Sequence, residues 1–137
     1  MSEQIFFAEA AMGRKVTAPA LVASDGFSAR YDLDRIRGVF SRPEHKLAGQ
    51  SYKDRILVLD AAKGGVATAW MLYEMRSRGV MPAALVLNRV NPIMVQGAAL
   101  AGFTMISGFA IDITKAIPSG STVEIDPTAE RPFIRVL

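Results

Sequence analysis

The most regular hydrophobic pattern lies in the middle of the chain. Residues 55–60 (Arg-Ile-Leu-Val-Leu-Asp) form a continuous apolar run with the length of a buried strand. Residues 66–78 follow as an expected helix, which is apolar at its start and carries two arginines in its last turn, where cations suit the helix dipole. Gly79 is placed to end that helix, and residues 83–87 are a second apolar run. This order predicts a strand–helix–strand unit with two parallel strands.

The same order recurs in the next segment of the chain. Asn91 is a good helix cap and Pro92 a good first helical residue, so they predict a helix over residues 93–101. Gly102 ends this helix, and residues 104–106 form a short third strand.

Further strands are expected on both sides of this central unit. Residues 24–38 predict an exposed polar loop, residues 40–54 are irregular, and residues 111–116 fit neither periodicity. The flanking strands are predicted at residues 5–10 and 16–23, around the turn at 13–15, and at residues 122–125 and 133–137, after a turn at 118–121. The fold class is therefore α/β, with a strand-rich layer beside a small parallel βαβ layer in a single domain over residues 1–137.

Composition narrows the chemistry that this chain can perform alone. The 137 residues include no cysteine, which excludes disulfides, a cysteine nucleophile, thiolate zinc and an iron–sulfur cluster held by this chain alone. His45 is the single histidine, so a multi-histidine metal site within the chain is also excluded, and we expect His45 to be a capping or surface residue.

Charge and hydropathy indicate a cytoplasmic protein without nucleic-acid or membrane partners. The net charge is +3, but no basic stripe alternates with aromatic residues as in nucleic-acid-binding surfaces. No apolar run reaches the roughly 18 to 20 residues that cross a bilayer, and the N-terminus does not have the pattern of a signal peptide. A mild positive charge suits small anionic substrates or an acidic partner.

A candidate anion site follows the first central strand. Lys63, Gly64 and Gly65 lie between that strand and the helix, where free backbone N–H groups attract a carboxylate or phosphate. The spacing is not that of a Walker loop, and a tight turn that needs glycine for its geometry is the alternative interpretation. Thr68 lies in the first helical turn, where its hydroxyl can face a ligand or bond back to the chain.

Asn88 lies at the end of the second central strand, and ligands of open α/β sheets bind at such strand ends. The loop with Lys63 ends the preceding strand, so both loops are expected to line one crevice. Ser28 and Arg30 offer a hydroxyl and a forked cation from the polar loop, although a solvated loop is the simpler interpretation of these two residues.

The order of these features resembles the small-subunit family of aconitase X, also described as predicted aconitase subunit 2. The likeness covers roughly residues 12–126. Its main pieces are His45-x-Leu-x-Gly-x-Ser51, Ile56-Leu-Val58, Lys63-Gly64, Leu72-Tyr73, Asn88, Pro92-Ile93 and Gly97-Ala-x-Leu-Ala-Gly102.

This resemblance implies a swivelling β/β/α fold and a heterodimer in which the chain is inactive without a large subunit. That subunit is expected to hold an iron or iron–sulfur cofactor, with no cofactor in this chain. The family activities are dehydrations, by enzymes similar to phosphomevalonate or cis-3-hydroxy-L-proline dehydratases. Arginine outnumbers lysine by about two to one, and the Lys/Glu enrichment typical of hyperthermophiles is absent. As the substrate we therefore expect cis-3-hydroxy-L-proline or another small anionic hydroxy acid.

The chain departs from the family at the proposed base. That base is a serine directly after Lys-Gly, and this position is Gly65 here. Thr68 is the nearest hydroxyl and the candidate catalytic residue, although an unassisted threonine is a poor base. Alternatively Ser28 or the large subunit supplies the base, the substrate differs, or the chain is not part of a dehydratase.

Two other interpretations come from different classes of protein. Residues 64–69 resemble the swivelling phosphohistidine domain of phosphoenolpyruvate-utilising enzymes, but the phosphorylated histidine falls at Ala69, which excludes phosphotransfer there. The second is a non-catalytic small-ligand-binding or assembly module, which the glycine at position 65 would suit.

Overall fold

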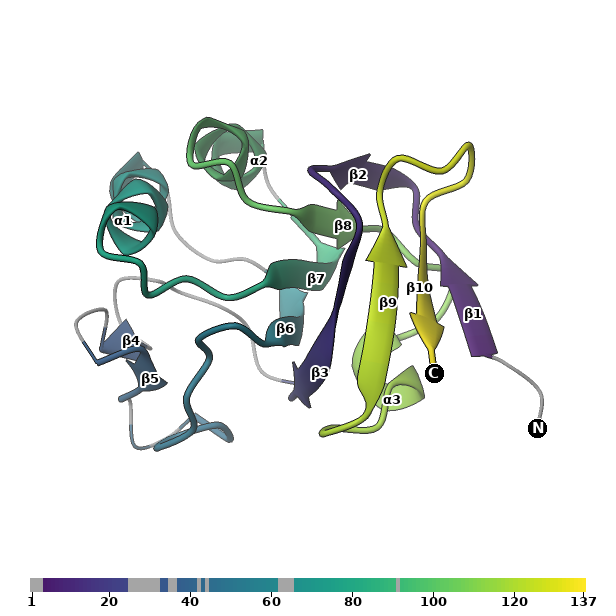
Figure 1. The fold of residues 1–137 in the computed structure, drawn as a ribbon, viewed down its shortest axis with the longest axis horizontal. Coiled ribbons are helices and arrows are strands. Elements are labelled where there is room, and N and C mark those ends of the chain that lie inside the picture. The colour runs from purple at the N-terminus through teal and green to yellow at the C-terminus, as the bar shows by residue number, and fades with distance from the viewer. Residues whose placement is uncertain are drawn as a thin grey trace.

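The computed structural model describes residues 4–24, 33–34, 37–41, 43, 45–61, 66–90 and 92–137, with side chains except at 33–34, 66–71 and 92–94. Its elements alternate strands with three helices (Figure 1). In chain order they are β1 (Gln4–Phe7), β2 (Ala10–Met12), β3 (Val16–Val22), β4 (Leu33–Asp34), β5 (Val39–Phe40), β6 (Ile56–Ala61), α1 (Val66–Ser77), β7 (Ala84–Arg89), α2 (Pro92–Leu100), β8 (Met105–Ser107), α3 (Ile113–Ala116), β9 (Thr122–Asp126) and β10 (Phe133–Val136).

Eight strands join in the order β1-β10-β9-β3-β6-β7-β8-β2. Strands β6, β7 and β8 are parallel, which confirms the predicted strand–helix–strand unit and its third strand. Strands β1, β10 and β9 pair antiparallel and form the strand-rich layer. The two helices α1 and α2 lie on the far side of β6–β8 from that layer, so the predicted α/β layering is confirmed (Figure 1).

Strand β3 joins the two layers because its two halves pair differently. Val16–Pro19 pair antiparallel with β9, whereas Ala20–Val22 pair parallel with β6. Pro19 lies at the change of partner, where a residue without an N–H interrupts the pairing least. One strand therefore belongs to both layers and fixes the angle between them.

The sheet also curls until its two ends meet. Strands β1 and β2 stand at opposite ends of the strand order, yet only Ala8 and Glu9 separate them in the chain. The Ala8 N–H donates to the carbonyl of Pro132 at 2.8 Å, and the Glu9 N–H donates to that of Gly108 at 2.8 Å. The prediction of one strand over residues 5–10 was therefore wrong, because the chain crosses here between two strand partners.

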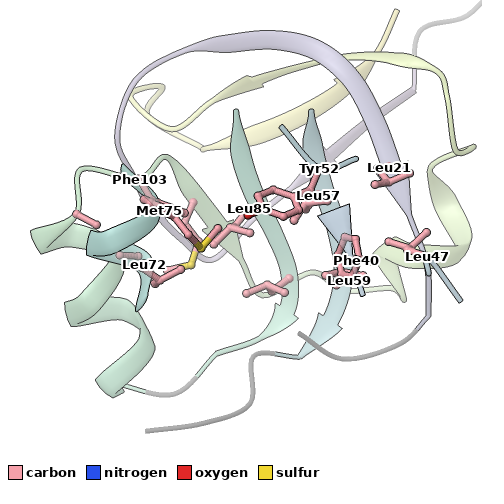
Figure 2. Packing of buried hydrophobic residues seen from close by; sticks show 14 of the residues in the cluster. Leu21, Phe40, Leu47, Tyr52, Leu57, Leu59, Leu72, Met75, Leu85 and Phe103 are labelled. Carbon is pink, nitrogen blue, oxygen red and sulfur yellow. The ribbon is translucent and has the colours of Figure 1, made fainter. Parts of the chain in front are cut away.

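Two cores result from this arrangement. The inner core lies within the curled sheet and is made of Ala20, Ile56, Val58, Ala84, Val86, Ile106, Ile113, Ile117, Val123, Ile125 and Ile134. The helix-side core lies between β6–β8 and the helices and continues to Leu21, Phe40, Leu47 and Tyr52 (Figure 2). Successive strand residues point to opposite faces, so β6 and β7 supply side chains to both cores. This explains why residues 56–59 of β6 and residues 84–87 of β7 are all apolar.

Both long helices end as predicted. Gly79 and Gly102 have φ values of 70° and 73°. After α1 the Gly79 and Val80 N–H groups donate to the carbonyls of Arg76 and Met75, and the same pattern follows α2. These are Schellman caps, in which glycine avoids the strain of a left-handed residue. Among the described residues, no helix combines the length and the apolar character needed to cross a membrane.

The described residues between 40 and 54 consist mainly of turns, as expected. His45 is only 3% exposed, so of the two expected roles, capping or surface, the surface one does not apply. Its ring stacks on Phe40 with 4.7 Å between the ring centroids, and its Nδ1 accepts from the Leu47 N–H at 3.0 Å. The expected capping role is therefore confirmed. Residues 111–116, which fitted no pattern, contain the short helix α3.

Candidate functional site

Two polar side chains meet where β6 and β7 end. Leu59 pairs with Leu87, so the next residues, Asp60 and Asn88, lie side by side. Both follow inward-facing valines by two positions and therefore point to the inner-core side of the sheet. The Asn88 Nδ2 donates to Asp60 Oδ1 at 3.0 Å. This is the sheet edge where open α/β folds bind ligands.

Asn88 also holds the start of α3. Its Nδ2 donates to Asp112 Oδ1 at 2.8 Å, and its Oδ1 accepts from the Ile113 N–H at 2.9 Å. Asp112 caps the helix by accepting from the Thr114 N–H at 3.0 Å and from the Thr114 hydroxyl at 2.7 Å. One amide therefore links the ends of two strands to a helix start and fixes the shape of this edge.

The carboxylate of Asp112 is held in its ionised form. The Thr114 hydroxyl lowers the pKa of Asp112 most, and the Asn88 amide lowers it further. Hydrogen bonds to a carboxylate favour the charged form, which explains the direction of this shift. Asp112 therefore acts as a hydrogen-bond acceptor at neutral pH and not as a proton donor.

Arg89 brings a cation to the same edge. It pairs with Ala61 across β6 and β7, and its Nη2 lies 3.1 Å from Asp60 Oδ2. The Arg89 side chain is 75% exposed. A guanidinium has five N–H donors in a rigid fork, so an arginine oriented by one carboxylate can still bind a second, incoming anion.

The structure locates the predicted site residues only in part. Asn88 lies at the strand end as predicted, and its side chain takes a bracing role that the sequence did not indicate. Thr68 lies in the first turn of α1, and its side chain is outside the described part of the structure. The other predicted ligand-binding residues fall wholly outside the described residues; these are Ser28, Arg30, Lys63, Gly64 and Gly65.

Three residues at this edge were missed by the sequence analysis. Asp60 ends the first apolar strand and Arg89 follows Asn88, so the rule that directed attention to Asn88 also applied to them. Asp112 had a weaker signal, because a cap before four helical residues has no periodic pattern behind it. Among the described residues, no three His, Cys, Asp or Glu side chains gather in a group that could hold a metal ion.

Comparison with known proteins gives a consistent result over nearly the whole chain. The family described as "Aconitase X swivel domain" matches residues 5–135. The phosphomevalonate dehydratase small subunit of Methanocella arvoryzae is 31% identical over 117 residues, which cover 85% of this chain and 89% of that protein. The protein of the same name from Thermococcus sibiricus is 34% identical, over 83% of this chain and 85% of its own length.

A solved structure agrees with this fold. The crystal structure of Thermococcus kodakaraensis aconitase X in its holo form superposes with a TM-score of 0.88, and the match covers 98% of each chain. The sequence identity in this match is 20%, so it supports the arrangement of strands and helices alone.

Proposed function

Because the chain belongs to the aconitase X swivel-domain family, we propose that it is the small subunit of a two-chain dehydratase. Such an enzyme is a hydro-lyase, which removes water from a hydroxy acid. The observation that carries the proposal is the polar edge formed by Asp60, Asn88 and Arg89 at the carboxyl ends of β6 and β7. This edge offers fixed polar groups to a small anionic substrate, and a large subunit would cover it.

The substrate's anionic group is recognised by cations and backbone donors of this edge. Arg89 lies there, paired with Asp60 at 3.1 Å, and Lys63 with the backbone of Gly64 and Gly65 forms the adjoining loop in our proposal. Asn88 braces the edge through Asp60 and Asp112 and binds substrate with its remaining acceptor capacity. Ser28 and Arg30 reach the same crevice from their loop.

Dehydration requires a base that removes the proton from carbon and a group that helps the hydroxyl leave as water. An iron or iron–sulfur centre in the large subunit would supply the Lewis acid that helps the hydroxyl leave. Thr68, Ser28 or a residue of the large subunit takes the proton, since Gly65 has no side chain at the position of the family's serine. A threonine in this role needs a neighbour that accepts its own proton.

Two substrates are candidates, each from a different observation. The printed names of the relatives make phosphomevalonate the first substrate to test. The arginine-rich composition without Lys/Glu enrichment supports cis-3-hydroxy-L-proline as the second. Both are small hydroxy acids with at least one carboxylate, so Arg89 and, in our proposal, Lys63 suit either of them as cationic partners.

The test is reconstitution of the pair. The chain is co-expressed with the aconitase X large subunit of its own organism, and the purified pair is loaded with iron under anaerobic conditions. Proton NMR then follows the loss of one water from phosphomevalonate or from cis-3-hydroxy-L-proline. Each chain alone serves as a control and should be inactive.

Two variants of the reconstituted pair test the proposed roles of Lys63 and Thr68. Lys63→Ala should raise the KM for the substrate, and Thr68→Ala should lower kcat if Thr68 is the base. An iron-loaded pair that dehydrates neither compound would overturn the proposal in favour of the non-catalytic module, which Gly65 suits.

A further inference from the structure

Strand β1 is apolar on both of its faces. Phe6 packs against the inner core. Ile5 and Phe7 point the other way, and these residues remain 40% and 42% exposed. A strand with one face in water normally alternates apolar and polar residues, so two outward apolar side chains indicate a surface that meets another protein.

A groove runs beside this strand. It has a volume of about 570 Å³, and its walls are residues 5–9, 108–111 and 130–132. Ile111, which also lines the groove, is 48% exposed. Three of the six exposed large hydrophobic residues in the described part of the chain, Ile5, Phe7 and Ile111, therefore line one groove. Such clustering marks a binding surface, whereas single exposed hydrophobic residues do not.

The rim of the groove is acidic, although the whole chain is basic. Glu9 and Glu130 line the groove, and the ionised Asp112 follows Ile111 directly. The guanidinium of Arg131 lies 3.9 Å from the centre of the Phe7 ring and covers part of it. With Arg131 counted, the charged residues that line the groove sum to −1, whereas the net charge of the chain is +3. A partner that fits this surface has an apolar segment flanked by basic side chains.

The groove adjoins the candidate functional site. Ile111 and Asp112 are consecutive, and Asp112 is bonded to Asn88 at the end of β7. A standard protein–protein interface buries about 800 Å² and some 20–30 residues on each partner. A subunit that covers the strand-end site with an interface of this size also reaches the groove.

We propose that this β1 groove is the docking surface for the large subunit. The large subunit inserts an apolar segment between Phe7 and Ile111, and its basic side chains face Glu9 and Glu130. This assignment rests on the two-chain enzyme proposed above. The assignment adds to that proposal the surface through which the two chains bind each other.

The test measures the dissociation constant of the pair by calorimetric titration. Phe7→Ser and Ile111→Ser each remove one apolar wall and should weaken binding by tenfold or more. Glu130→Lys reverses a rim charge and should weaken binding most at low salt. Leu100→Ser is the matched control, because Leu100 is 73% exposed on α2 and should change the affinity less than twofold. The melting temperature of each variant alone verifies that it folds.

The outcomes separate this surface from the function. Groove variants that bind like the wild type, or a Leu100 variant that weakens equally, would overturn the docking surface while the pair remains active. Variants that alter self-association of the small chain alone would assign the groove to a second copy and overturn the proposal. A pair that depends on the groove but dehydrates neither substrate would support the docking surface and refute the dehydratase. A chain that does not bind the large subunit would refute both.

Discussion

Asn88 and Asp112, which are 24 residues apart, are joined by a hydrogen bond of 2.8 Å from Nδ2 to Oδ1. The same amide reaches Asp60 on one side and the Ile113 N–H on the other. This bond makes the position of α3 depend on the end of β7. The candidate site and the adjoining groove therefore share one brace.

A matched pair of variants measures how much the hydrogen bond between Asn88 and Asp112 contributes to stability. Asp112 and Asp126 make the same local contacts, each accepting from the N–H two residues on at 3.0 Å and from that threonine's hydroxyl at 2.7 Å. Only Asp112 also bonds Asn88. Asp112→Ala should therefore lower the free energy of unfolding by about 1–2 kcal/mol more than Asp126→Ala, measured by urea unfolding at pH 7. Equal losses would show that the bond to Asn88 contributes nothing.

Because of the carboxyl groups of Asp112 and Asp126, we expect the stability of the fold to fall in acid. The Thr114 and Thr128 hydroxyls are the largest cause that lowers the pKa of Asp112 and Asp126 below the usual 3.8. A lowered folded pKa contributes stability above the unfolded pKa, and this stability is lost as the pH falls through the folded pKa. We expect the free energy of unfolding to fall below about pH 4, and less steeply in Asp112→Ala. Carboxyl ¹³C NMR titration checks the two sites, and ordinary titration of both would contradict the prediction.

The central half of the fold was predictable because its signals are local. Apolar runs bounded by glycine and Asn91-Pro92 identified β6, α1, β7, α2 and β8 and their parallel order. The curl of the sheet was not predictable, because it depends on pairs such as Gln4 with Val136 that no local pattern encodes. For the same reason Asn88 was found at its strand end, whereas its partner Asp112 was missed.

The ends of α1 and α2 allow a test of why each helix is followed by glycine. Gly79 and Gly102 have nearly the same φ, but a Cβ at Gly79 meets nothing within 4 Å, whereas at Gly102 it would lie 2.3 Å from Arg76 Nη1. Gly79→Ala should cost about 1–2 kcal/mol of stability from backbone strain alone. Gly102→Ala should cost about 1 kcal/mol more, because it displaces the Arg76 bond to the Ala101 carbonyl at 2.9 Å. In an Arg76→Ala background the two costs should agree, and a persisting difference would refute the explanation.

Two neighbours on α1 test the helix-side core. Leu72 is fully buried, whereas Tyr73 is 53% exposed. Leu72→Ala should lower the free energy of unfolding by about 2–5 kcal/mol, because it removes buried methyl groups and leaves a cavity. Tyr73→Ala should change it by about 0.5 kcal/mol or less. Thermal or urea unfolding of both variants checks the contrast, and similar losses would mean that α1 does not pack as described.

Arg89 tests anion recognition in the reconstituted pair. Arg89→Gln should raise the KM for the substrate by about tenfold, because it removes the charged guanidinium at the strand end. Arg89→Lys keeps the charge but not the forked geometry, so its KM should lie between those of the wild type and Arg89→Gln. Arg78→Gln is the control, since Arg78 also pairs with an acid, Glu74, at 3.3 Å, but at the far end of α1. Steady-state kinetics separates KM from kcat. An unchanged KM in Arg89→Gln would exclude Arg89 from substrate binding.

The pairing of β1 with β10 has a consequence for how the protein is made. Strand β1 pairs with β10, so residues 4–7 have no partner until residues 133–136 have been synthesised. Such distant pairing raises contact order and slows folding, whereas the local β6–α1–β7 unit can form early. During that wait the apolar face of β1 stays uncovered, and a chaperone or the partner chain would protect it from aggregation.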